Sequence, residues 1–225
     1  MPDPLPPSDS YQTFGPENAL GRAFYGERTE KVARALLGQY LVRELSGELG
    51  GELGGELGGE LLVGRISETE AYGGETDSAS HASHGRTTRN APMYGAPGHA
   101  YVYLIYGLHE MFNIVTEREG EAGAVLIRAL EPVAGIGRMR TLRKGKPDFQ
   151  LANGPGKLAQ AMCINRRNLN THDLCLGREI WLTPGSAVPK ESVIVGPRVG
   201  IDFAVPEDRD APLRFRLGGT ISGAW

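Results

Sequence analysis

The chain has 225 residues, of which 40% are hydrophobic and 23% are charged, and its formal net charge is −3. This composition is typical of a globular protein, and no apolar run approaches the roughly 18 residues that a membrane span needs. The only two cysteines, Cys163 and Cys175, have no CxxC or zinc-type spacing, which argues against a zinc site and favours a reduced, cytoplasmic protein.

The N-terminal part of the chain predicts a leader followed by a short helix. Residues 1–15 are rich in proline and have neither the basic nor the apolar region of a signal peptide, so we expect a flexible leader. Residues 29–37 predict a helix, with Thr29 as its N-cap and Gly38 just past its end.

The rest of the chain is mostly strand-like. The Gly-Glu-Leu-Gly repeat at 47–61 falls between two strand-like segments and predicts an enlarged hairpin loop. Residues 73–99 form a long polar loop, a kind that is usually functional or disordered, and 106–109 form a turn. We expect strands at 39–45, 61–72, 100–105, 112–116, 124–130 (ended by Glu131-Pro132), 179–182, 193–199 and 213–217, and helices at 135–143 and 156–163.

This order of elements indicates the fold class. Strands mostly follow strands, so we expect a mixed α/β fold: a single domain over 16–225 with a curved, mainly antiparallel sheet flanked by helices. No Rossmann or P-loop fingerprint is present.

The charge is unevenly distributed along the chain. Residues 128–167 carry nine basic and two acidic side chains, so this segment has a charge of +7 and the remainder about −10. Such a stripe can follow the phosphates of a nucleic acid even in an acidic protein. A solvated helical surface explains the same charges equally well.

The strand-like segment ISETEAY places Glu68, Glu70 and Tyr72 on one face, because side chains alternate along a strand. Two acids and an aromatic side chain suit either a polar pocket or the solvated face of an edge strand. A sugar hydrolase using both acids is disfavoured, because side chains two residues apart project in parallel, about 6.6 Å from each other, and cannot flank a bond from opposite faces.

Tyrosines and histidines supply the other candidate site residues. Tyr101 and Tyr103 share a face of their strand, and Tyr106 stands at a turn beside a glycine, where it could protrude as a wedge. Aromatic side chains stack on an extruded base or fill the gap that it leaves. His81 and His84 lack the accompanying ligands of a metal site, and the zinc deaminase signature is absent.

Several segments together resemble one enzyme family. Their order and spacing are similar to those of the alkyladenine DNA glycosylases, the eukaryote-type 3-methyladenine DNA glycosylases. The segments that carry the resemblance are ETEAY, HxxxGRTTRN, the stretch from Met93 to Gly98, YVYLIYG, FNI, VLIRALEP, GPGKLAQAM and PRVGI. The resemblance runs from about Thr29 to Leu217. This chain differs by the repeat at 47–61 and by two extra residues between Asn113 and Arg128, which leaves the substrate range open.

The resemblance implies a role for each matching residue. Glu70 matches the general base that activates water, and Arg128 matches an arginine near it. Tyr106 matches the tyrosine that inserts through the DNA minor groove, which implies a protruding β-hairpin. Asn113 matches the asparagine that crowds the 2-amino group of guanine. The flipped base would meet Tyr72, His81, Tyr103 and Leu126, and the expected DNA contacts are Met93, Arg86, Arg89, Arg138, Arg140 and Lys157.

The resemblance also implies the reaction. A monomeric, monofunctional enzyme, nucleoid-associated if bacterial, would flip alkylated or deaminated purines from double-stranded DNA and cleave the glycosidic bond with water, using no cofactor or metal. The physics of the predicted site agrees, because a carboxylate stabilises an oxocarbenium-like state and tyrosines attract cationic purines. The alternative is a nucleic-acid-binding protein without catalytic activity, which would need neither Glu70 nor Arg128.

Overall fold

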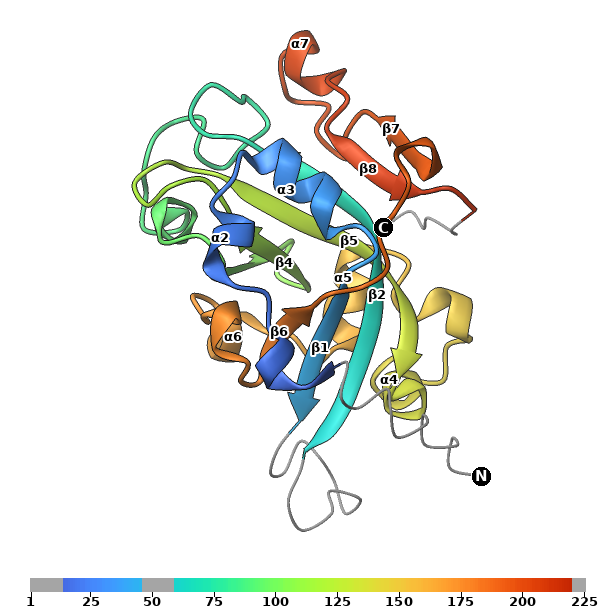
Figure 1. Cartoon of the computed structure of the whole chain (residues 1–225). Helices are drawn as coiled ribbons and strands as arrows, with labels where there is room; N and C mark the ends of the chain where they lie inside the picture. Colours follow the sequence, from blue (N-terminus) through green and yellow to red (C-terminus); the bar gives the residue numbers. More distant parts are fainter. Residues whose placement is uncertain (1–13, 46–58, 220–225) are drawn as a thin grey trace.

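One antiparallel sheet runs through the centre of the computed structural model (Figure 1). Its main path has the strand order β3-β4-β5-β2-β1-β6, and β8 pairs with both β2 and β7. The strands are β1 (Tyr40–Leu45), β2 (Glu60–Tyr72), β3 (Ala100–Ile105), β4 (His109–Val115), β5 (Ala124–Ala134), β6 (Ile180–Thr183), β7 (Val193–Gly196) and β8 (Arg214–Leu217). The predicted mixed α/β class with an antiparallel sheet is therefore confirmed.

The structure describes residues 14–45 and 59–219. The predicted leader, apart from its last two residues, and most of the glycine-rich repeat lie outside this part of the chain. Leu45 of β1 pairs with Glu60 of β2, so the repeat connects two neighbouring antiparallel strands, as expected. The second strand begins at Glu60, inside the segment that the sequence assigned to the loop.

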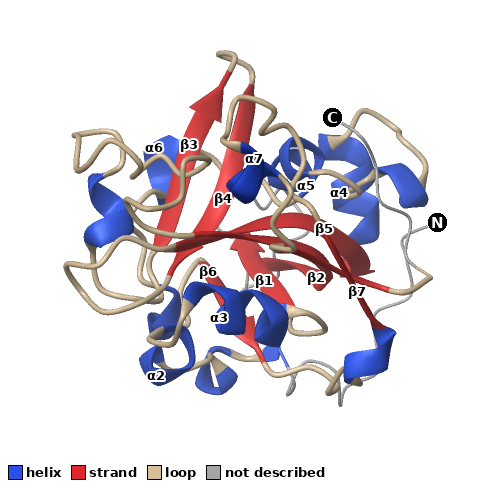
Figure 2. Cartoon of the chain, turned by 90° about the horizontal axis from the view of Figure 1, so that it is seen from above, coloured by secondary structure: helices blue, strands red, loops and turns tan. Residues whose placement is uncertain are grey.

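Helices cover the sheet on both sides (Figure 2). Helix α3 packs on β2 and β5 through buried Val32 and Leu36, and the Thr69 hydroxyl of β2 donates a hydrogen bond to the Ala33 carbonyl of this helix. Helix α5 packs on β4 and β5. The helices are α2 (Arg22–Tyr25), α3 (Thr29–Leu36), α4 (Ile136–Leu142), α5 (Pro155–Ala161), α6 (Arg166–Leu169) and α7 (Pro206–Arg209).

Two local predictions were wrong. Thr29 is the first residue of α3 rather than its N-cap, because Glu117 Oε1 accepts from the Thr29 backbone N–H at 2.6 Å and takes over the capping. Strand β5 continues through Pro132 instead of ending there. Pro132 faces Gly64 at an irregularity in the pairing, and β4 pairs only with the first residues of β5, so the missing N–H of proline breaks no ladder.

Strands β2 and β5 are joined through an irregular register that determines where one arginine points. Glu68 pairs with Ala129 and Thr69 with Ile127, so Arg128 between them has no partner in the register. Such a bulge bends the sheet and redirects a side chain. The bulge places Arg128 beneath the middle of β2, facing Glu68 and Glu70.

Strands β3 and β4 form a hairpin that projects beyond the rest of the sheet (Figure 2). Its turn spans Tyr106 to Leu108, and Tyr106 and Gly107 have φ values of 52° and 68°. Positive φ at both central positions suits the twist of a two-stranded hairpin, although a non-glycine residue adopts it at some cost. The turn is one residue shorter than predicted, because His109 already belongs to β4.

Candidate active site

A cavity of about 380 Å³ lies at the base of the projecting hairpin. Its walls come from β2, β3, β4 and β5 and from two loops, 79–93 and 199–203. The predicted residues that line it are Tyr72, His81, Met93, Tyr103, Tyr106, Asn113 and Leu126. The other lining residues are Ala79, Tyr101, Ile105, Ala124, Val199, Gly200, Ile201 and Phe203. The structure thus brings residues from distant parts of the sequence around one largely apolar, aromatic space.

An aromatic cluster forms one wall of the cavity. The rings of His81 and Tyr103 lie 4.5 Å apart, and His81 Nδ1 is 2.9 Å from the Tyr101 hydroxyl. Removal of water from the ring, together with the nearby Arg89 guanidinium, lowers the pKa of His81 to about 4. His81 is therefore neutral at pH 7 and presents an uncharged ring to the cavity.

Glu70 lies behind the wall of the cavity rather than in it. Its side chain is fully buried, and it is not among the lining residues. Glu70 Oε2 accepts from the Tyr72 hydroxyl at 2.9 Å, and Oε1 accepts from the Val199 backbone N–H at 2.8 Å. Two lining residues therefore connect the carboxylate directly to the cavity.

Arg128 holds both acids of β2 from one side. Its Nε donates to Glu68 Oε1 at 3.0 Å and its Nη1 to Glu70 Oε2 at 3.3 Å, with all three side chains at most 3% exposed. Burial raises the pKa of Glu70, although Arg128 and the hydrogen bonds oppose this change. Burial alone would lower the pKa of Arg128, but the negative charges of Glu70 and Glu68 have the larger combined effect and raise that pKa. The face carrying the two acids is buried, which rules out the solvated edge strand.

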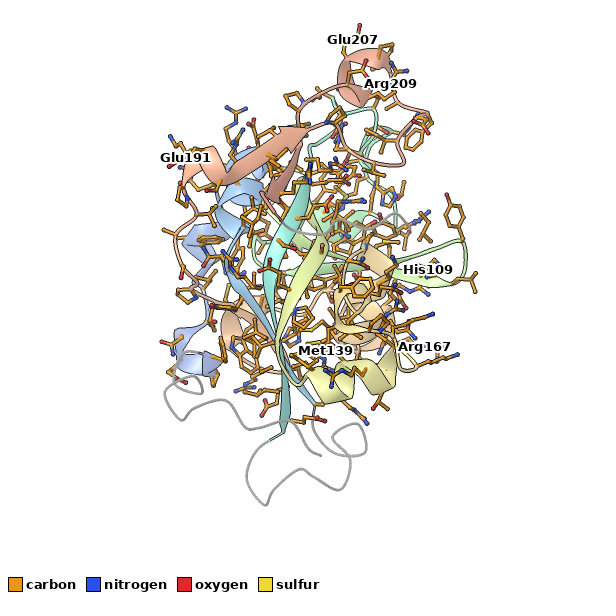
Figure 3. All side chains as sticks on the ribbon, turned by 90° about the vertical axis from the view of Figure 1, so that its right-hand side faces the viewer. His109, Met139, Arg167, Glu191, Glu207 and Arg209 are labelled. Atoms are coloured by element: carbon orange, nitrogen blue, oxygen red, sulfur yellow. The ribbon has the colours of Figure 1, made fainter. Side chains whose placement is uncertain are left out.

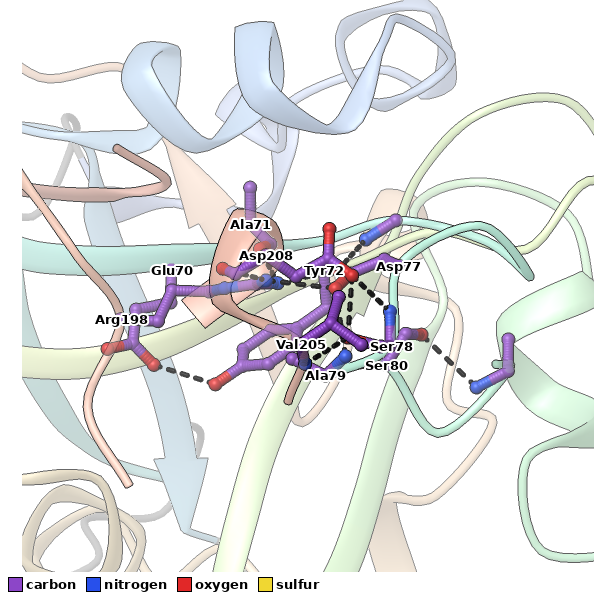
Figure 4. A network of polar contacts seen from close by, with 12 residues as sticks. Glu70, Ala71, Tyr72, Asp77, Ser78, Ala79, Ser80, Arg198, Val205 and Asp208 are labelled. Atoms are coloured by element: carbon purple, nitrogen blue, oxygen red, sulfur yellow. Dashed lines mark hydrogen bonds and ion pairs between the residues drawn. The ribbon is translucent and has the colours of Figure 1, made fainter. Parts of the chain in front are cut away.

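A second buried arginine, which we did not identify from the sequence, supports the opposite wall (Figure 4). Arg198 Nη1 and Nη2 donate to the Asp77 carboxylate at 2.5 and 2.8 Å, and its guanidinium lies 4.8 Å from the centre of the Tyr72 ring. Arg198 also donates to the carbonyls of Ala71 and Asp208. It therefore ties the segment before Val199 to the Tyr72 ring, which lines the cavity.

The side chain of Asn113 is fixed in the cavity wall. It is 3% exposed, and its Nδ2 donates to the carbonyl oxygens of Tyr101, at 3.0 Å, and Met111, at 3.4 Å. Both amide hydrogens are thus occupied by backbone groups, which prevents the side chain from turning away from the cavity. A rigid polar group at this position limits which substituents a bound ring can carry.

The hairpin tip exposes two apolar side chains above the cavity. Tyr106 is 84% exposed and Leu108 78%. The ring of Tyr106 also lines the cavity, so the tip and the mouth are continuous. Tyr106 thus stands exposed in the turn between β3 and β4.

The predicted DNA contacts occupy different environments. Arg86 and Arg89 are exposed on the loop that lines the cavity, where their guanidinium groups lie 5.6 Å from the ring centres of Tyr94 and Tyr103, respectively. Met93 is 1% exposed and belongs to the cavity wall, not to the surface.

The basic segment 128–167 is less uniform than its sequence suggests. Arg128 is buried in the site, Arg140 pairs with Asp148 at 2.7 Å, and Arg138 lies 3.7 Å from Glu60. Lys157 donates to Asn153 Oδ1 at 3.3 Å. Arg167, from the far end of the segment, lies on the same side of the molecule as His109 at the start of β4 (Figure 3). Helix α6, which carries Arg167, packs against β3, so part of this charge lies near the hairpin.

Over residues 14–45 and 59–219, no group of three or more His, Cys, Asp or Glu side chains is placed to hold a metal ion. None of the helices in these two ranges has both the length and the apolar character needed to cross a membrane.

Comparison with known proteins places these features in a family. The model of the methylpurine-DNA glycosylase family matches residues 23–220. A protein of Carboxydothermus hydrogenoformans is 46% identical over 88% of this chain and 94% of its own length. One of Methanocella arvoryzae is 48% identical over 87% of this chain and 90% of its own length. Both relatives are provisionally named 3-methyladenine DNA glycosylases.

Proposed function

This chain belongs to the methylpurine-DNA glycosylase family, and from that membership we propose that it excises damaged purines from double-stranded DNA by hydrolysis of the N-glycosidic bond. The proposed substrates are 3-methyladenine, 7-methylguanine, hypoxanthine and ethenoadenine. The observation that carries the proposal is the buried pair of Glu70 and Arg128 directly behind an aromatic cavity.

Glu70 is the proposed general base. Water attacks C1′ of the damaged nucleotide, the bond from C1′ to the base nitrogen breaks with its electron pair going to the base, and Glu70 takes one proton from the water. The carboxylate also stabilises the oxocarbenium-like state by its charge. Arg128 holds Glu70 in place and favours its ionised form.

Water must reach Glu70 for this chemistry. Because Oε2 of Glu70 already accepts from both Tyr72 and Arg128, a water that attacks from this oxygen has to take the place of one of these two donors. Of these two donors, the Tyr72 hydroxyl belongs to a side chain that lines the cavity. We propose that a purine stacked on Tyr72 shifts this ring and lets the water approach Glu70 Oε2.

The cavity would select its base by three means. Tyr72 on one side and Tyr103 with His81 on the other offer aromatic faces, which attract cationic methylated purines by about 0.5–2 kcal/mol. Neutral hypoxanthine and ethenoadenine would be held by stacking and shape. Asn113, fixed by two carbonyl groups, would crowd the 2-amino group of undamaged guanine.

The hairpin would keep the base out of the stack. Tyr106 would enter the DNA through the minor groove and occupy the space that the flipped base leaves. The phosphates would be contacted by Arg86, Arg89, Arg138, Arg140 and Lys157. Of these, Arg138, Arg140 and Lys157 would have to loosen their present contacts.

The decisive experiment uses duplexes that each carry one damaged purine. After incubation with enzyme, alkali cleaves the strand wherever a base has been released. Strand cleavage at the lesion, together with free base in solution, supports the proposal. Binding without any release on all four lesions would contradict it and favour a binding protein without catalytic activity.

A further inference from the structure

A second exposed aromatic ring stands at the mouth of the cavity and comes from outside the hairpin. Phe203 lines the same cavity as Tyr106, and its side chain is 76% exposed. The two rings come from unrelated parts of the chain. Tyr106 lies in the turn of the hairpin, whereas Phe203 belongs to the rim loop, which we define as residues 199–205.

The rim loop is anchored to the body of the protein, so the exposure of Phe203 does not come from a loose segment. At one end the Val199 N–H donates to Glu70, and at the other the Val205 N–H donates to the Ser78 hydroxyl at 3.1 Å. Ile201 and Ala204, on either side of Phe203, are 4% and 7% exposed and pack with Ala79. The loop therefore buries Ile201 and Ala204, the apolar side chains on either side of Phe203, and presents this ring at the rim.

The charges around Phe203 indicate which part of DNA it meets. Asp202 beside it is exposed, and the segment that follows carries Glu207, Asp208 and Asp210 against one basic side chain, Arg209, so this part of the rim is acidic on balance (Figure 3). Acidic side chains repel phosphates, so this rim does not serve as a phosphate contact. The deoxyribose has apolar faces between its phosphates, and the sugar of a base held in the cavity has to stand at the mouth.

We propose that Phe203 packs against the deoxyribose of the flipped nucleotide and holds it over the cavity. This inference rests on the proposed function, since it requires a nucleotide whose base occupies the cavity. It gives the two rings different roles: Tyr106 fills the vacated stack, and Phe203 holds the extruded sugar whatever base it carries.

The test compares Phe203→Ala with Phe203→Leu and with the control Val205→Ala, an exposed residue of the same loop that does not line the cavity. Affinity is measured for a duplex with a tetrahydrofuran abasic nucleotide, which keeps the sugar ring and lacks the base. Excision of hypoxanthine and of ethenoadenine is measured in duplex and in single-stranded DNA.

We expect Phe203→Ala to weaken binding to the abasic duplex by about tenfold, in line with the loss of a partly buried aromatic ring. Excision should fall similarly for both lesions and on both kinds of DNA, whereas Phe203→Leu should recover most of the loss and Val205→Ala should behave like the wild type. Unchanged binding to the abasic duplex would overturn the inference. So would a loss confined to duplex DNA or to one lesion.

The two proposals fail in different ways. Absence of base release by the wild-type enzyme contradicts the proposed function, whatever Phe203 does. Normal release by both the wild type and Phe203→Ala contradicts only the role of Phe203.

Discussion

Replacement of Glu70 by glutamine tests the chemistry most directly, because the structure provides a matched control two residues away. Glu68 lies on the same strand, is similarly buried and contacts the same arginine, with Arg128 Nε 3.0 Å from Glu68 Oε1. Glu70 in addition accepts hydrogen bonds from the Tyr72 hydroxyl and the Val199 N–H, two residues that line the cavity. A loss of folding stability should therefore appear in both Glu70→Gln and Glu68→Gln, whereas a large loss of excision rate should appear in Glu70→Gln alone.

The hydrogen bonds of Glu70 indicate the size of the structural effect. A glutamine amide has one acceptor oxygen, so its NH₂ group has to face either the Val199 N–H or the donors at Oε2, Tyr72 and Arg128. One buried donor is left without an acceptor, which costs about 1–3 kcal/mol of folding free energy. Glu68→Gln removes a charge from Arg128 and should destabilise the protein by a similar amount.

The catalytic effect should be much larger for Glu70. Loss of a general base typically slows a reaction by about 10²–10⁴-fold, and loss of the negative charge near the developing cation adds to this. Single-turnover excision of hypoxanthine, with enzyme in excess, reports the chemical step without product release. We expect Glu70→Gln to lose at least about 10²-fold and Glu68→Gln about tenfold or less. A folded Glu70→Gln protein within about tenfold of the wild type would refute the assignment, as would equal losses in the two variants.

Three further predictions follow from the same geometry. Because burial raises the pKa of Glu70, excision of cationic 7-methylguanine should rise with pH through a midpoint above the ordinary glutamate value of about 4.3; a midpoint at or below that value would contradict this. Tyr106→Ser should reduce excision from duplex DNA much more than from single-stranded DNA, and equal losses on both would argue against gap filling. Asn113→Ala should raise excision of normal guanine relative to hypoxanthine by about tenfold or more, and an unchanged ratio would show that the cavity excludes guanine by other means.

Much of the fold was predictable because its strands alternate clearly. The segment 100–105 was predicted with the bounds that β3 has, and the turn at Tyr106 followed from the glycine beside it. The end of β5 was not predictable, because the tolerance of Pro132 depends on the absence of a neighbouring strand on one side. The capping of α3 by Glu117, 88 residues away, is likewise a tertiary contact that local patterns do not contain.

The candidate site, like the fold, could be predicted only where local sequence patterns determine it. Glu70 and Tyr72 could be placed on one face by alternation, and the family resemblance singled out Glu70. That the carboxylate lies behind Tyr72 rather than in the cavity depends on packing alone. The Val199 N–H is a backbone group, so no side-chain pattern could identify it. Arg198 stood within the motif PRVGI, but its partner Asp77 is 121 residues distant in the sequence.

Strand β2 places the glycine-rich repeat far from Glu70. It meets β1 at Glu60, where the glycine-rich repeat enters, and carries Glu70 ten residues further along. At about 3.3 Å per residue, the two points are about 33 Å apart along the strand. Between them β2 is paired on both sides over two stretches, residues 63–65 with β1 and β5 and residues 68–70 with β8 and β5. We therefore expect changes in chain length at the repeat to leave the reaction undisturbed.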